Sequence, residues 1–191
     1  SFDHAGVIGS AGALDIVSAG DVLAGGTISA GGNATLAARG AVIQNGQVDA
    51  GGLLGVRAAE ITLAGRAIGV GGITISGSTV LLDSTGDLAS GASLLVDSRS
   101  ALGIFGKLGS RADVSLAAAT SLSLGATLSA NGAVRIDAGT SLGLSGSIQA
   151  GRSVVVVGES LATDGEIVSD ANVRFTSRSG GALLDGIISG K

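Results

Sequence analysis

The 191-residue chain contains no cysteine, proline, methionine, tryptophan or tyrosine. The lack of cysteine excludes disulfides, thiolate metal ligands and a cysteine nucleophile. A single histidine excludes a metal site built on a histidine pair. Only three aromatic residues remain, Phe2, Phe105 and Phe175. The missing methionine, and a start at Ser1 without a charged and then apolar leader, predict an internal piece of a longer protein.

Charge is sparse and of mixed sign. Eleven basic and fifteen acidic residues give a net charge of -4, and the basic residues are scattered. Because nothing concentrates positive charge, we expect no nucleic-acid partner. Apolar residues make up 45% of the chain, which is enough to build a core. The uncharged run 114–134 alternates apolar residues with Ser, Thr, Gly and Asn, which is typical of strands and not of a membrane-spanning helix.

What the chain does have is glycine, 35 residues of it, arranged in a repeat. Units of about 20 residues begin near positions 6, 26, 46, 66, 86, 106, 126, 146, 165 and 186. The period holds along the whole chain, so we expect residues 1–191 to form a single segment without a linker.

Apolar residues recur at fixed places within each unit. The third position is always aliphatic: Ile8, Ile28, Val48, Ile68, Leu88, Leu108, Leu128, Ile148, Ile167 and Ile188. A small residue, a glycine-rich corner and two further alternating segments follow it, as in 134–138 and 142–144. Each unit therefore predicts three short strands joined by turns, with glycine supplying positive φ or close backbone approach at the corners.

Stacked units of this kind predict a parallel β-helix. The 3.6-residue period of a helix is missing. One unit alone buries too few side chains to offset the entropy of ordering its backbone, so stability must come from neighbouring coils. We expect an all-β solenoid of nine full coils and a partial one, with three short parallel sheets and the third-position residues in one inward column.

Two stretches of this repeat, GGTISAGGNATLAA and SANGAVRIDAGTSL, resemble the haemagglutinin-type repeats of filamentous haemagglutinin and related two-partner-secretion exoproteins. The resemblance covers residues 6–190. It implies a right-handed β-helix shaft, secreted or displayed at the surface of a Gram-negative bacterium, in a large adhesin or a contact-dependent inhibition toxin. An outer-membrane transporter would act through regions outside this chain, because the secretion-domain signature is missing from it.

Some β-helix proteins are polysaccharide-active enzymes, and hydrolysis of a glycosidic bond needs two carboxylates close together. Asp97 and Asp137 share an outward position, but Ala117 lies between them and places them about 10 Å apart. We expect them to be solvated surface charges. Ser1, Asp3 and His4 have the residue types of a catalytic triad, but they lie at a chain end that we expect to be frayed. We expect no catalytic residues.

Other polar residues favour turns. Asp83 and Asp87 flank a turn and are expected to cap it, with calcium binding as the alternative. The sequon Asn33-Ala-Thr35 is also interpreted as a turn. We expect no metal and no cofactor.

Ligand contacts on the surface have only weak candidates. Arg111 and Arg152 are expected near one corner, two coils apart, as weak contacts for an anionic glycan. We expect no aromatic ladder for sugar stacking, because Phe175 alternates inward and Phe105 closes a coil.

The sequence thus favours a non-catalytic shaft. Its partners, met through the full-length protein, would be a host-cell receptor or glycan, or a target bacterial cell. The alternative is that the shaft surface itself binds glycans or a receptor. A polysaccharide-active enzyme is the weakest of the three hypotheses.

Overall fold

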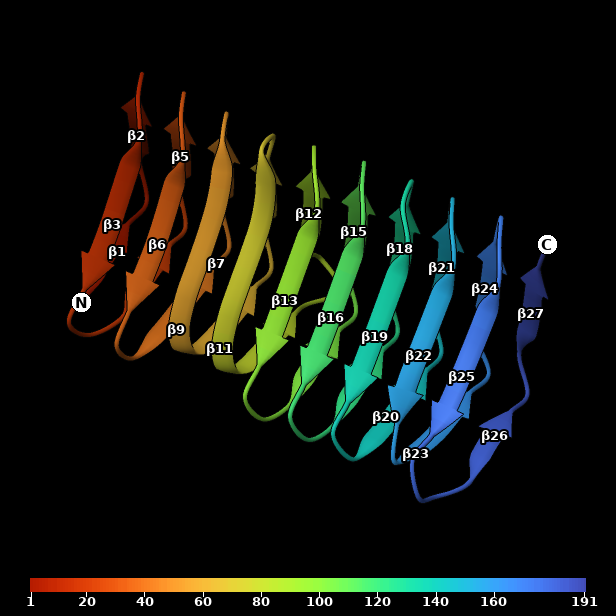
Figure 1. Ribbon diagram of the computed structural model, residues 1–191. Helices are drawn as coiled ribbons and strands as arrows, with labels where there is room; N and C mark the ends of the chain where they lie inside the picture. The colour runs from red at the N-terminus through yellow and green to blue at the C-terminus, as the bar shows by residue number, and fades with distance from the viewer.

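The computed structural model describes all 191 residues as strands and turns without any helix. The chain winds into a parallel β-helix in which nine full coils stack along one axis (Figure 1). The two termini lie at opposite ends of the stack (Figure 1). No helix is present that is long and apolar enough to cross a membrane.

Each coil contributes strands to three faces. The first face is the 10-stranded sheet of β2 (Val7–Ser10), β5 (Thr27–Ala30), β8 (Gln47–Ala50), β10 (Arg66–Gly69), β12 (Asp87–Ser90), β15 (Lys107–Ser110), β18 (Thr127–Ala130), β21 (Ser147–Ala150), β24 (Glu166–Ser169) and β27 (Ile187–Gly190). The second face contains β3 (Leu14–Ser18), β6 (Ala34–Ala38), β13 (Leu94–Ser98), β16 (Val114–Ala118), β19 (Val134–Ala138), β22 (Val154–Gly158) and β25 (Val173–Ser177). The third contains β1 (Phe2–His4), β4 (Val22–Ala24), β7 (Ala41–Gln44), β14 (Leu102–Ile104), β17 (Leu122–Leu124), β20 (Ser141–Leu144), β23 (Ser160–Thr163) and β26 (Ala182–Leu184).

The second and third faces are joined into one 17-stranded sheet by two long strands. These are β9 (Leu53–Leu63) and β11 (Gly72–Leu82), which run through the corner without a break (Figure 1). The corner is shorter there: two residues, 59–60 and 78–79, separate the inward positions of the two faces. In the second and fifth coils three residues separate these inward positions, 39–41 and 99–101 respectively. The shortened corner gives a 19-residue third coil.

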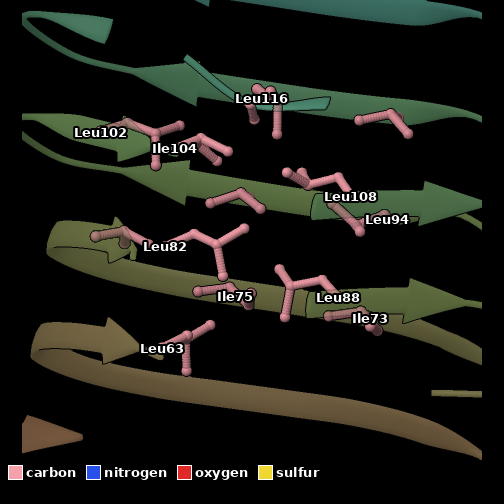
Figure 2. Close-up of a cluster of buried hydrophobic side chains, with 14 of the residues drawn as sticks. Leu63, Ile73, Ile75, Leu82, Leu88, Leu94, Leu102, Ile104, Leu108 and Leu116 are labelled. Atoms are coloured by element: carbon pink, nitrogen blue, oxygen red, sulfur yellow. The ribbon is translucent and has the colours of Figure 1, made fainter. Parts of the chain in front are cut away.

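The core is one continuous cluster of 45 buried apolar residues that fills the inside of the coils. Strand alternation sends every second side chain inward, and parallel pairing stacks equivalent residues of successive coils, as with Leu88 and Leu108. Figure 2 shows such side chains from successive coils, among them Leu88 and Leu108, lying between the ribbons. Phe175 packs against this cluster, as its alternation with Val173 predicts.

The inward column of the first face differs from the sequence prediction at one residue and at one repeat boundary. Val48 pairs with Ala67, and Ala67 pairs with Leu88. Ala67 is 2% exposed and occupies the column, whereas Ile68 is only partly buried on the outer side. The fourth unit therefore begins at residue 65, not 66. A slip of one residue exchanges the faces of a strand, and here both candidates are apolar.

The corners hold the few buried polar groups. The Ser90 hydroxyl oxygen lies 2.9 and 3.0 Å from the carbonyl oxygens of Ala92 and Ser93, which share its single proton as acceptors. The Ser110 hydroxyl donates to the Ala92 carbonyl at 2.7 Å, which links two coils. Of the two roles open to corner glycines, positive φ applies only at Gly72, where φ is +130°. Close approach of the neighbouring coil accounts for many of the others, such as Gly46 beside the Gly26 carbonyl, whereas Gly69 is crowded by the Gly72 carbonyl of its own coil.

Candidate functional site

The two carboxylates that share an outward column lie on β13 and β19. Asp97 pairs with Ala117, and Ala117 pairs with Asp137, so a whole coil separates them. Asp137 accepts hydrogen bonds from the guanidinium groups of Arg135, at 2.8 Å, and Arg178, at 2.6 Å. This carboxylate is thus held by two cations on the outer surface.

The amino-terminal residues do not assemble a triad. The prediction that this chain end is frayed is wrong, since β1 pairs in parallel with β4. Phe2, Asp3 and His4 lie opposite Val22, Leu23 and Ala24. Strand alternation puts the side chain of Asp3 on the opposite side of the strand from that of His4. The centroids of the His4 and Phe2 rings are 6.2 Å apart. His4 Nε2 is buried without a hydrogen-bond partner.

The turn after β11 is capped by Asp83, as the sequence predicts, whereas Asp87 is the first residue of β12 and does not take part in the cap. Its Oδ1 accepts hydrogen bonds from the Thr85 N–H at 3.2 Å and the Ser84 hydroxyl at 3.1 Å. These bonds, that of the Thr85 N–H above all, hold the pKa of the Asp83 carboxyl below its usual range. No cluster of three metal-ligating side chains occurs in the structure.

Asn33 has a comparable role between coils, where its Oδ1 accepts a hydrogen bond from the Leu53 N–H at 2.9 Å. Asn33 lies at the corner directly before β6, whereas Ala34 and Thr35 are the first two residues of that strand, so the sequon is only partly in a turn.

Arg111 and Arg152 lie at the corner between the first and second faces. The Arg111 N–H bonds to the Ser90 carbonyl, and the Arg152 N–H bonds to the Gly132 carbonyl two coils further on. Both side chains are exposed, and neither takes part in an ion pair. Contact of these two residues with a glycan stays a prediction.

A groove of about 460 Å³ lies over the shortened corner of the third and fourth coils. Its lining includes three exposed arginines, Arg39, Arg57 and Arg99, which come from the second, third and fifth coils. Alanine, glycine and serine residues form its floor. We call it the arginine groove; the sequence does not reveal it, because corner length alone brings these side chains together.

A second groove, of about 520 Å³, contains the aromatic side chain that the sequence places wrongly. Phe105 is 46% exposed and lines this groove, so it does not close a coil into the core. Its ring covers Gly103 and Gly125: a Cβ at either position would lie 3.1 or 3.0 Å from the ring. Asp164 and Asp185 line the far part of the groove. It offers one aromatic ring, not a ladder.

The haemagglutinin repeat model matches residues 1–43, 37–92 and 89–184, which together cover nearly the whole chain. The chain belongs to the haemagglutinin repeat family. Neither a curated protein nor a solved structure matches it.

Membership of the haemagglutinin repeat family agrees with the β-helix and with a structural shaft of a large adhesin-like protein. The family is a structural and adhesin family without catalytic activity, and it is typical of secreted or surface-exposed bacterial exoproteins. In this haemagglutinin repeat chain the coils themselves are the main feature, and the two grooves are local features of their surface.

Proposed function

We propose that the chain is a shaft within a secreted, surface-displayed bacterial adhesin, which projects a binding or effector region toward a host cell or a neighbouring bacterium. The observation that carries the proposal is the single core of 45 residues, which continues through all nine coils without a break. Each coil is tied to the next by parallel ladders on every face. Such a molecule holds its ends at a fixed separation, about 45 Å for a little over nine coils.

Excision of whole coils tests the spacing role. Removal of residues 86–125 takes out two coils of 20 residues and leaves every column in register. In the exported protein we expect this variant to keep its fold, its export and its attachment to target cells, with a reach shortened by about 10 Å. Removal of residues 86–115 takes out one and a half coils, exchanges strands between faces and should abolish folding and export.

The same pair of excisions separates the shaft from a binding module. If the two-coil variant folds and reaches the surface but no longer attaches, the excised coils bind the target and the spacing role is wrong. Display itself is tested by an epitope inserted between the exposed Ser84 and Thr85. Antibody should label intact cells that carry it, and labelling only after the cells are opened contradicts surface display.

A further inference from the structure

We propose that the arginine groove binds the carboxylate group of an acidic sugar. The inference does not depend on the shaft role, which the excision of coils tests separately. It begins from charge: the chain has three ion pairs, and none includes Arg39, Arg57 or Arg99. Three guanidinium groups around one hollow therefore have no carboxylate of this chain as partner.

The corner geometry explains why the three side chains share one hollow. The third and fourth coils each have a corner one residue shorter than their neighbours on either side. Arg39 stands on the longer corner of the second coil and Arg99 on that of the fifth. Arg57 points outward from β9 between them. The two longer corners thus flank a depression whose floor carries only short side chains.

A second shortened corner shows how this edge holds a carboxylate. In the eighth coil two residues, Glu159 and Ser160, make the corner. The Arg178 side chain of the ninth coil crosses it to Asp137 of the seventh, at 2.6 Å, and to the Ala138 carbonyl, at 3.1 Å. Arg135 completes the pair around Asp137. In the second coil the position of Asp137 is taken by Ala37, so an anion at the arginine groove must come from outside.

The surroundings favour a single carboxylate over a dense polyanion. Glu60 follows the floor residue Ala59, and Asp97 lies in the column of Arg57, two coils further on. These acidic side chains would repel a chain with closely spaced charges. Guanidinium groups bind carboxylates through paired N–H donors, and the volume of about 460 Å³ is in the range of sites for small ligands.

The floor favours a sugar over a peptide. Ser18, Ser76 and Ser78 line the groove, and their hydroxyls are suited to the hydroxyls of a sugar ring. The backbone of the strands beneath is already paired with neighbouring coils on both sides. A peptide laid across them finds no free main-chain groups for strand addition.

The test compares two double variants of the 191-residue chain with the same change in charge. In Arg57→Gln/Arg99→Gln the groove loses two cations. In Arg111→Gln/Arg152→Gln two exposed arginines are lost at another corner. Galacturonate and 3′-sialyllactose, which carry one carboxylate each, are titrated as carboxylated sugars, with lactose as the neutral sugar and hexaglutamate as the peptide. We expect at least one carboxylated sugar to bind, and its affinity to fall about tenfold or more in the groove variant alone.

Binding by galacturonate, by sialyllactose or by both identifies the source of the carboxylate and supports the proposal. It is overturned if neither carboxylated sugar binds, if lactose binds equally well, or if both double variants weaken binding alike. Hexaglutamate that binds as tightly, with the same dependence on Arg57 and Arg99, assigns the groove to acidic peptides instead. Equal melting temperatures of the two variants show that any loss comes from the groove and not from unfolding.

Discussion

The Asp21 carboxylate occupies the space where a Cβ on Gly40 would lie: the ideal Cβ position is 2.1 Å from Asp21 Oδ1. The same oxygen accepts a hydrogen bond from the Ala41 N–H at 2.8 Å. The arrangement recurs at other corners, where Asn33 is paired with Gly52 and Asp113 with Gly132. A side-chain oxygen from one coil thus caps the backbone of the next, and glycine leaves room for it.

A double-mutant cycle tests this relationship. We expect Asp21→Ala to lower the free energy of unfolding by about 1 kcal/mol through the lost hydrogen bond. Gly40→Ala should cost a similar amount, because the new methyl displaces the carboxylate. In the double variant the nearest of these atoms that remains is the Gly20 carbonyl oxygen, at 3.5 Å from the alanine methyl, which is ordinary contact. Denaturant unfolding should therefore give a double effect well below the sum of the single ones, and strict additivity would contradict the cap.

The corrected register of β10 predicts opposite outcomes at adjacent positions. Ala67→Lys places a charge in the core between Val48 and Leu88 and should cost several kcal/mol. Ile68→Lys faces outward beside Asp49 and should cost about 1 kcal/mol or less. Thermal melts of the two variants decide the matter, since the reverse order would restore Ile68 to the column.

Gly72 is the one position where backbone conformation requires glycine. Its φ of +130° is rarely adopted by residues with a Cβ, so Gly72→Ala should lose about 1–3 kcal/mol. Gly143→Ala is the matched control, because no atom lies within 4 Å of its Cβ position. We expect its melting temperature to stay close to that of the parent; equal losses in the two variants would show that Gly72 has no special role.

Asp83 predicts a dependence of stability on pH. Hydrogen bonds favour its charged form, so the folded-state pKa lies below the usual 3.8. Its contribution is therefore complete above the unfolded-state pKa and is lost as the pH falls through the lower folded-state pKa. The melting temperature of the parent should exceed that of Asp83→Asn at neutral pH, and the gap should close below pH 3.8. A carboxyl titration followed by NMR that gives a pKa at or above 3.8 contradicts the cap.

Sensitivity to substitution should follow the inward columns. Leu128, fully buried between Leu108 and Ile148, should not tolerate aspartate: Leu128→Asp is expected to cost several kcal/mol. Arg135→Ala removes one exposed partner of Asp137, and Arg178 still pairs with that carboxylate. We therefore expect the free energy of unfolding to change by about 1 kcal/mol or less. If calorimetric melts show equal damage, the assignment of inner and outer sides on these coils is wrong.

The regular part of the molecule could be predicted from the sequence because strand alternation and the 20-residue period act locally. The turn at Asp83 was predictable for the same reason, since its partners are Ser84 and Thr85. The register at Ile68 was not, because Ala67 beside it is also apolar. The bond from Arg178 to Asp137 spans 41 residues and depends on the lengths of two corners. The arginine groove depends on corner length in the same way, and apolar periodicity carries no information about it.

The parallel ladders that tie each coil to the next also determine how the rod would respond to force. Hydrogen bonds between coils point along the axis, so tension applied to the two ends opens them one coil at a time instead of shearing all of them together. A coil adds about 5 Å to the folded rod, but its 20 or so residues extend to about 70 Å once released. An adhesin tethered through such a shaft would lengthen in steps under drag, and each step would lower the force on the bond at its tip.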